Sequence, residues 1–125
     1  MREILFRAKH IHIFQENKHL DGMWVYGFLE DNDYINSPEL EEEFLIDPET
    51  VCQYTGLKDR NGKKIFEGDI VKSDLDKIGK IAFNESHMAF MILESRENRY
   101  YYVEECDGNH IEIIGNIFDN PELIN

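Results

Sequence analysis

The sequence predicts a mainly β protein, built from small coiled antiparallel sheets or a partly open SH3-like barrel with one or two short helices. Apolar residues recur with a period of two or stand in short continuous runs, which is typical of strands. Asn-Gly and Gly-Asp pairs, which favour turns, separate these runs. The 125 residues include eight Phe, six Tyr and one Trp, and 42% of them are hydrophobic, which is enough for one core. We therefore expect residues 1–125 to form a single domain.

Three strand patterns lie in the N-terminal part of the chain. Ile4 and Phe6 share one strand face, and Ile11 and Ile13 share another after a short break. The third pattern is the run at residues 23–29, in which three aromatic residues alternate with Met, Val, Gly and Leu. Because both faces of that run are apolar, we expect this strand to be covered on both faces.

An acidic segment follows these strands. Residues 31–50 contain eight acidic residues and no basic ones, and the densest run, 39–43, comes directly after Ser37-Pro38. Ser37 suits the position before a helix and Pro38 suits its first turn, so we interpret the run as a solvated loop or a short helical turn. The functional alternative is a cation site or an acidic patch that faces a partner. A calcium loop is not indicated, because the run lacks alternating oxygen ligands and a Gly turn.

Short strands joined by tight turns are predicted for the second half of the chain. Asn61-Gly62 is the strongest hairpin signal, because both residues tolerate positive φ. Residues 80–84 and 88–94 predict an antiparallel hairpin, and residues 66–72 with this hairpin resemble the opening strands of SH3-like barrels. An Asx residue before proline predicts a short helix after Asp47 and another after Asn120. The other predicted strands are residues 70–73, 99–104 and 110–114.

The net charge of −13 restricts the classes of partner. With 26 acidic and 13 basic residues, broad affinity for nucleic acid is not expected. The acidity is uneven: residues 51–82 hold seven basic and five acidic residues, whereas residues 83–125 hold two and nine. The sequence has no apolar run near the roughly 20 residues that span a bilayer. We expect a cytoplasmic protein without a membrane partner, and reduced thiols at Cys52 and Cys106.

Catalytic and metal-binding signatures are absent from the sequence. His10 and His12 share a strand face, but no third ligand stands at a suitable spacing. The chain has no nucleophile elbow, phosphate loop or dinucleotide fingerprint. Alternation along Tyr100-Tyr101-Tyr102 favours core packing over stacking on bases. We therefore expect no enzymatic activity, no cofactor, no catalytic residue and no metal site.

Residues 51–71 carry a long and specific motif. The segment contains a Gln-Tyr-Thr-Gly-Leu-x-Asp core, followed by Asn-Gly and Glu-Gly-Asp. It resembles the signature of the YopX family, small proteins of bacteriophages and prophages. Residues 2–7, 23–27 and 113–123 resemble the family's opening strand, aromatic-Gly strand and closing motif. The resemblance implies a phage or prophage origin, a bacterial host cell and a β fold, and it implies no reaction.

The motif also has a physical interpretation. Its glycines recur every six residues and let the chain turn back, and its hydroxyl and carboxyl groups can hold those turns by hydrogen bonds, caps or salt bridges. We predict a structural role for the motif, with a binding surface built on it as the alternative. The residues concerned are Gln53, Tyr54, Thr55, Gly56, Asp59, Gly62, Glu67, Gly68 and Asp69.

Three functional hypotheses follow. The first is a non-enzymatic, β-rich interaction module for a host or phage protein, able to form a homo-oligomer through its sheet edges. The second is an acidic DNA mimic that uses residues 31–50 and 83–125 to inhibit a host DNA-binding protein. The third is a module for single-stranded nucleic acid, which would use aromatic and basic side chains together. Those side chains are Tyr54, Phe66, Lys58, Lys63, Lys64, Lys72 and Lys80.

Overall fold

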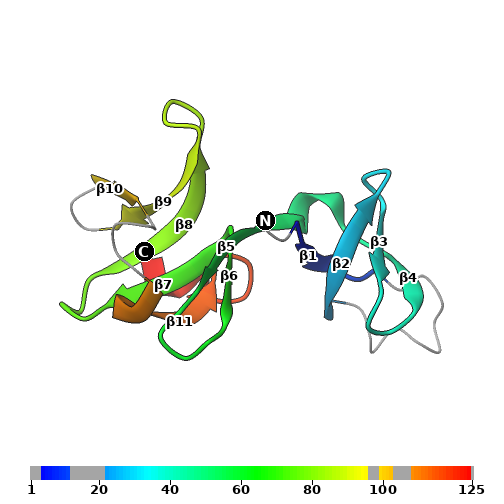
Figure 1. The fold of residues 1–125 in the computed structure, drawn as a ribbon, viewed down its shortest axis with the longest axis horizontal. Coiled ribbons are helices and arrows are strands. Elements are labelled where there is room, and N and C mark those ends of the chain that lie inside the picture. The colour runs from blue at the N-terminus through cyan, green and yellow to red at the C-terminus, as the bar shows by residue number, and fades with distance from the viewer. Residues whose placement is uncertain (1–3, 12–21, 96–98, 103–107, 125) are drawn as a thin grey trace. The chain divides into compact units, whose positions relative to one another are not determined.

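The fold is mainly β, as the sequence predicts. A computed structural model of the chain describes residues 4–11, 22–95, 99–102 and 108–124. In these ranges the regular structure consists of antiparallel strands and short 3-10 helices, and no sheet closes into a barrel (Figure 1). No helix in the same ranges has the length and hydropathy needed to cross a membrane. The chain divides into two compact units, Met1–Tyr54 and Thr55–Asn125, which we describe separately.

The first unit is an antiparallel meander. Its strands pair in the order β4-β3-β2-β1, and the beginning of β5 pairs with β1. The 3-10 helix η2 (Pro48–Thr50) confirms the first predicted helix, and the carboxylate of Asp47 caps it by accepting the Glu49 N–H at 3.1 Å. The strands are β1 (Phe6–Lys9), β2 (Trp24–Glu30), β3 (Tyr34–Ser37), β4 (Glu42–Leu45) and β5 (Cys52–Lys58).

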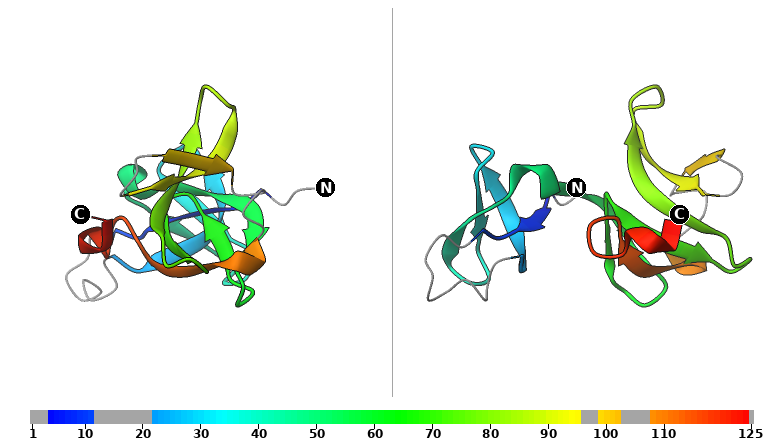
Figure 2. Two further views of the ribbon diagram at one scale, coloured as in Figure 1. Left: turned by 90° about the vertical axis from the view of Figure 1, so that its left-hand side faces the viewer. Right: turned by 180° about the vertical axis from the view of Figure 1, so that it is seen from behind.

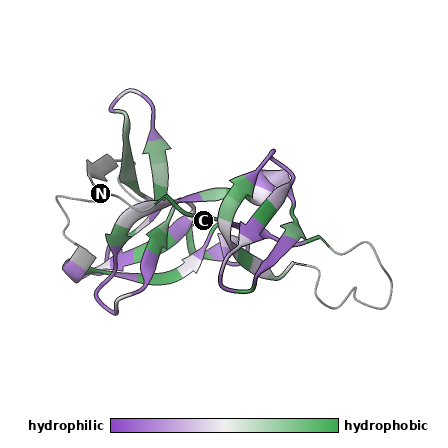
Figure 3. Ribbon diagram, turned by 45° about the vertical axis from the view of Figure 1, so that its right-hand side comes forward, coloured by the Kyte–Doolittle hydropathy of each residue, from purple (hydrophilic) through white to green (hydrophobic). Residues whose placement is uncertain are grey.

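One face of the first sheet forms its core. Ala8, Val25, Ile35, Phe44 and Ile46 pack together on this face, which we call the inner face. Figure 3 shows the corresponding alternation of hydrophobic and hydrophilic residues along the strands. The expectation that residues 23–29 are covered on both faces is wrong. The core lies on only one side of β2, so the aromatic side chains on its other side remain half-buried or exposed.

The acidic run is part of a β-hairpin rather than a helical turn. Strands β3 and β4 pair across a turn at residues 38–41, with Ser37 opposite Glu42. The Ser37 hydroxyl does cap this turn, since it accepts the Leu40 N–H at 3.3 Å. The sequence pattern missed both strands because each spans only four residues, too few for a period of two to stand out.

The beginning of the chain also differs from the prediction. Ile4 precedes β1 and is 63% exposed, so it does not share a strand face with Phe6. Ile11 follows an isolated bridge between His10 and Ile46 and lies outside the strands. Ile13, its predicted partner, lies outside the described residues.

The second unit contains the remainder of β5, the adjacent β6 (Lys64–Phe66) and a five-stranded sheet. The predicted hairpin is confirmed, with Asn84 of β8 opposite Ala89 of β9, and it extends beyond the rest of its sheet (Figure 2). The 3-10 helix η3 (Gly108–His110) precedes β11, and η4 (Pro121–Ile124) lies against β8 and confirms the second predicted helix. The sheet has the order β10 (Arg99–Tyr102), β9 (Ala89–Glu94), β8 (Ile78–Asn84), β7 (Asp69–Ser73) and β11 (Ile111–Asn116).

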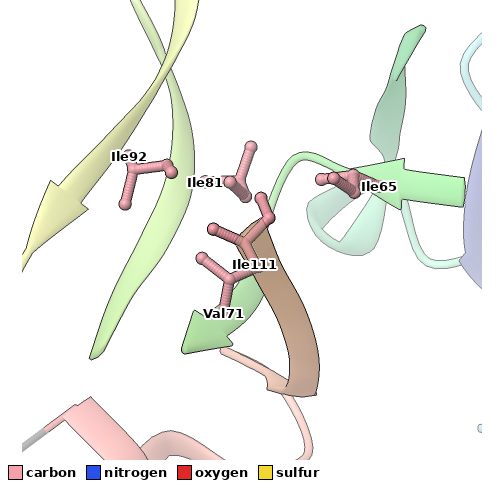
Figure 4. Packing of buried hydrophobic residues seen from close by; sticks show 5 residues of the cluster. All are labelled: Ile65, Val71, Ile81, Ile92 and Ile111. Atoms are coloured by element: carbon pink, nitrogen blue, oxygen red, sulfur yellow. The ribbon is translucent and has the colours of Figure 1, made fainter. Parts of the chain in front are cut away.

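The core of the second unit is aliphatic. Ile65, Val71, Ile81, Ile92 and Ile111 are nearly inaccessible to solvent and pack together (Figure 4). They come from β6, β7, β8, β9 and β11, so this cluster joins the short β6 to the five-stranded sheet. Each compact unit therefore has a hydrophobic cluster of its own.

Candidate binding surface

The signature residue Asp59 organises the turn between β5 and β6. Its Oδ1 accepts the N–H groups of Asn61 and Lys63, both at 2.9 Å, and its Oδ2 accepts the N–H of Ile113 in β11 at 3.0 Å. Burial is the largest influence on this carboxyl and acts to raise its pKa, but the three backbone donors and the charge of Lys63 together lower the pKa below the ordinary 3.8. Asp59 therefore links the Asn-Gly turn to a strand more than fifty residues away.

Thr55 and Asp69 hold neighbouring parts of the motif in the same way. The Thr55 hydroxyl donates to the Ile65 carbonyl at 2.8 Å and accepts the Leu57 N–H at 3.2 Å. The Asp69 carboxylate accepts the Phe66 N–H at 2.7 Å. Both side chains are buried, at 7% and 1% exposure, so their hydrogen bonds support the fold.

The glycines of the motif have different roles. Gly62 follows Asn61 in the predicted turn, where its φ of +82° needs a residue without Cβ. Gly68 also has positive φ, and its N–H donates to Ile81 while its carbonyl accepts the Ile117 N–H. Gly56 lies inside β5 with a φ of +93°, so it distorts a strand and does not make the turn that the six-residue spacing predicts.

The remaining motif residues lie at different depths. Tyr54 is buried, and its N–H donates to the Leu5 carbonyl at 2.8 Å. Gln53 is half-buried in β5 opposite Phe6, and Glu67 is half-buried in the turn before β7. Most side chains of the motif thus face the interior, and the binding surface proposed for them stays a prediction.

The closing motif is a turn fixed by two asparagines. The Asn116 side-chain carbonyl accepts the N–H groups of Phe118 and Asp119 at 3.0 and 2.9 Å, and Asn120 accepts the Asn116 N–H at 3.2 Å. Through the bonds of Asp59 to Ile113 and of Gly68 to Ile117, this motif is hydrogen-bonded to the signature segment. The two motifs form one structural unit within the second part of the chain.

A more accessible surface lies in the first unit, on the side of the sheet opposite the inner face. Along β2, Tyr26 and Phe28 are 46% and 52% exposed, and Tyr34 of β3 is 41% exposed. Tyr34 is diagonal to Phe28, because Phe28 pairs with Asn36 and diagonal neighbours lie about 7 Å apart. Trp24 is half-buried at the start of the same row. We call the surface of Trp24, Tyr26, Phe28 and Tyr34 the outer aromatic face.

The outer aromatic face has opposite charges at its two ends. At the Trp24 end, the Arg7 guanidinium carbon and the Lys9 Nζ lie 4.8 and 5.5 Å from the centroid of the indole ring. At the other end, Glu30 follows Phe28 and Leu29 on β2. A hydrogen bond with Glu43 of β4 and the charge of Glu43 raise the pKa of Glu30 above 4.5. The face is therefore cationic at one end and acidic at the other.

A small cavity lies in the second unit. Its volume is about 180 Å³, and the lining is mostly apolar, with Val71, Ile92 and Ile111 of the core on one side. Ser73, Lys77 and Glu94 supply its polar groups. A cavity of about 150 Å³ accommodates benzene in another protein, so this volume is large enough for one small apolar group.

An exposed polar cluster lies elsewhere in the second unit. The Asp74 carboxylate contacts the Arg60 guanidinium at 2.6 Å and His110 Nδ1 at 2.8 Å. The hydrogen bond from His110, followed by the charge and hydrogen bond of Arg60, lowers the pKa of Asp74 despite an opposing effect of desolvation. Sequence analysis missed this cluster because 14 and 36 residues separate Asp74 from its partners, with no local pattern to connect them.

Other predicted features are described in part. Cys52 is buried and its thiol donates to the Thr50 carbonyl at 3.3 Å, whereas Cys106 lies outside the described residues. His10 Nδ1 lies 2.7 Å from the Leu45 carbonyl, and His12 lies outside the described residues. Among the described residues, no three His, Cys, Asp or Glu side chains converge as metal ligands. The side chains of residues 100–102 are likewise not described.

The aromatic residues of the nucleic-acid hypothesis are buried. Tyr54 and Phe66 are 5% and 3% exposed, so neither ring offers a face on which a base could stack. Of the lysines in this hypothesis, Lys58 and Lys63 are exposed, whereas Lys64, Lys72 and Lys80 are half-buried. The hypothesis thus loses its stacking component at these positions.

The fold and motifs define a small, mainly β protein whose signature segment is hydrogen-bonded to its closing turn. The family model described as YopX protein matches residues 6–125, and the chain belongs to this family. The crystal structure of protein EF1440 from Enterococcus faecalis is similar over 100% of both chains, with 24% sequence identity and a TM-score of 0.58. This similarity shows the fold alone. A comparison with curated proteins gave no match.

Proposed function

We propose that this protein is a non-enzymatic interaction module, encoded by a phage or prophage and acting in the host cytoplasm, which binds a partner protein through the outer aromatic face. The observation that carries the proposal is the exposure of Tyr26, Phe28 and Tyr34 side by side on one sheet face. The chain belongs to the YopX family, and its resemblance to this family's signature is the ground for the proposed phage or prophage origin. The proposal includes no reaction and no cofactor.

Energetic considerations support a binding role for this face. An aromatic side chain presents about 150–250 Å² of surface, so covering the exposed half of Tyr26 or Phe28 would contribute about 2 kcal/mol for each ring. Tyr and Trp are enriched at protein interfaces, where they dominate the binding energy. The rings of Tyr26 and Phe28 add little to the core of the first unit, because they lie on the side of β2 that faces away from that core.

Affinity capture with matched variants tests the proposal. The wild-type protein, the double variant Tyr26→Ser/Phe28→Ser and the control Phe83→Ser would be immobilised and exposed to lysates of infected and uninfected bacteria. Phe83 is a suitable control because it is an aromatic residue of β8 in the second unit with 42% exposure. Quantitative mass spectrometry would identify the proteins retained by each.

We expect at least one protein to be retained by the wild type and by Phe83→Ser, and to be lost with the double variant. Urea unfolding of each variant, followed by circular dichroism, would verify that it is folded. Equal retention by the wild type and the folded double variant would contradict the proposal. A protein retained by the wild type and by the double variant but lost with Phe83→Ser would place the contact on the second unit and would also contradict the proposal.

A further inference from the structure

The charges around the outer aromatic face are arranged for self-recognition. Strand β2 runs from Trp24 to Glu30, and Gly27 is its middle residue. Lys9 and Arg7 of β1 stand opposite Trp24 and Tyr26, on the first half of the strand. Glu30 is on the second half and has Glu43 beside it. The positive and negative groups are therefore displaced to opposite sides of the strand centre.

A two-fold axis through the strand centre would match these charges. If two copies stack their outer aromatic faces with β2 antiparallel, position 24 of one lies over position 30 of the other, and position 26 lies over position 28. Trp24 would then face Glu30 of the second copy, and Tyr26 would face Phe28. Lys9 lies one strand to the side of Trp24, about 4.8 Å away, so its long side chain would reach the same Glu30 diagonally. If the β2 strands were parallel, Glu30 would face Glu30, and Lys9 of β1 would lie over β3 of the second copy, far from Glu30, which is electrostatically unfavourable.

From this arrangement we infer that the occupant of the outer aromatic face is a second copy of this chain, bound in an antiparallel two-fold dimer through Tyr26, Phe28 and the Lys9–Glu30 pairs. The inference rests on the proposed function, since it names the partner of the same face. The like-charged neighbours Glu30 and Glu43 support it, because a lysine from the second copy would relieve their repulsion.

The size of the face sets the expected strength. Strand β2 has seven residues, and β1, β3 and β4 have four each. At about 3.3 Å per residue and about 4.8 Å between strands, the face has a surface on the order of 300 Å² per copy. Stable interfaces bury about 800 Å² per partner, so this dimer is expected to be weak and in exchange with monomer. Association should be measured at protein concentrations from about 5 to 300 µM.

Sedimentation velocity over this concentration range is the test. We expect the wild type to shift from monomer toward dimer as the concentration rises, and Phe28→Ser to remain monomeric. Lys9→Glu and Glu30→Lys should each weaken the dimer by about tenfold or more, since each replaces two attractive pairs by repulsive ones. Phe83→Ser should dimerise like the wild type. Added salt should weaken the wild-type dimer.

Mixing the two charge variants gives the sharpest result. In a mixed dimer, Glu at position 9 faces Lys at position 30, and the native Lys9 faces the native Glu30, so both contacts are attractive. We therefore expect a mixture of Lys9→Glu and Glu30→Lys to form dimers at concentrations where each alone is monomeric. Trp24 fluorescence and urea unfolding would show that the variants are folded.

The outcomes separate this inference from the proposed function. A wild type that stays monomeric up to about 300 µM overturns the inference. The same holds for a dimer that neither Phe28→Ser nor the charge variants weaken. If the wild type is monomeric but another protein is lost with Tyr26→Ser/Phe28→Ser, the proposed function stands and the self-association is wrong. A dimer restored in the mixture supports the inference, whereas the capture experiment decides the proposed function separately.

Discussion

At the scale of single residues, Asp59 shows how a carboxylate, which is usually exposed to solvent, becomes a buried part of the fold. Only 4% of the residue is exposed, and both carboxylate oxygens accept backbone N–H groups. A buried carboxylate is costly unless hydrogen bonds compensate for its lost hydration, and here three donors do so. The hydrogen bonds that join the turn to β11 depend on the charged form of the Asp59 carboxylate. The contribution of Asp59 to stability therefore depends on pH.

The variant Asp59→Asn tests this account. The amide removes the charge and turns an N–H group toward a backbone donor, so we expect the free energy of unfolding at pH 7 to fall by about 2–3 kcal/mol. Urea unfolding followed by circular dichroism measures it. Asp33→Asn is the control, because Asp33 is exposed, and its effect should stay within about 0.5 kcal/mol.

Comparing the wild type with Asp59→Asn at different pH values tests the sign of the pH dependence of stability. The pKa of Asp59 is lower in the folded protein than the ordinary 3.8. At pH values between the folded pKa and 3.8, the unfolded chain therefore binds more protons than the folded protein. The stabilisation is present above pH 3.8 and is lost as the pH falls through the folded pKa. The difference in unfolding free energy between wild type and Asp59→Asn should therefore shrink at low pH. A difference that is constant from pH 7 to pH 2 would refute the assignment.

At the scale of elements, β2 illustrates the close pairing of strands in the first unit. A Cβ built on Gly27 would overlap the Asn36 carbonyl of β3 and would lie 3.0 Å from the Ser37 Cα. Both obstacles are backbone atoms that cannot rotate away. In contrast, a Cβ on Gly62 would have open space around it, and only the positive φ opposes a side chain. The two glycines are needed for different physical reasons.

Alanine substitutions at the two glycines should separate these reasons. Gly27→Ala forces β2 and β3 apart, and we expect a loss of about 3 kcal/mol or more, with the loss of Trp24 tertiary signal. Gly62→Ala adds only left-handed strain, for which we expect about 1–2 kcal/mol. Thermal and urea unfolding would measure both. Equal effects of the two substitutions would contradict the close approach at Gly27.

At the scale of the whole molecule, one strand takes part in both compact units. The beginning of β5 pairs with β1 in the first unit, while its later residues belong to the second unit beside β6. Unfolding of either unit therefore removes the partner from part of the same strand. This shared strand is the physical basis for expecting residues 1–125 to behave as one domain, although each unit has its own hydrophobic cluster.

Two probes of unfolding can examine this cooperativity. Trp24 is the single tryptophan and lies in the first unit, so its fluorescence reports that unit, whereas far-ultraviolet circular dichroism reports strands of both. We expect the two urea transitions to have the same midpoint and slope. Separate midpoints would show that the units unfold independently and that the chain comprises two domains. The core variant Ile81→Val of the second unit should then leave the Trp24 transition unchanged.

Local sequence determined much of this protein by itself. The period of two placed β2, β8 and β9 to within a few residues, and Asn61-Gly62 and the two Asx-Pro pairs marked a turn and two short helices. These features follow from local steric preference and alternation, which a sequence carries in neighbouring residues. The four-residue strands β3 and β4 were too short for that signal.

Tertiary structure alone decided which faces are covered and which distant groups meet. Nothing local shows that β2 is buried on one side only, because both sides of it are apolar and the burial of each depends on where Ile35 and Phe44 pack. The hydrogen bond from Ile113 to Asp59 and the cluster around Asp74 join residues far apart in the chain. Contacts of this kind depend on the pairing of distant strands. The roles of Asp59 and Asp74, and the exposure of the aromatic side chains of β2, are therefore decided only in the folded chain.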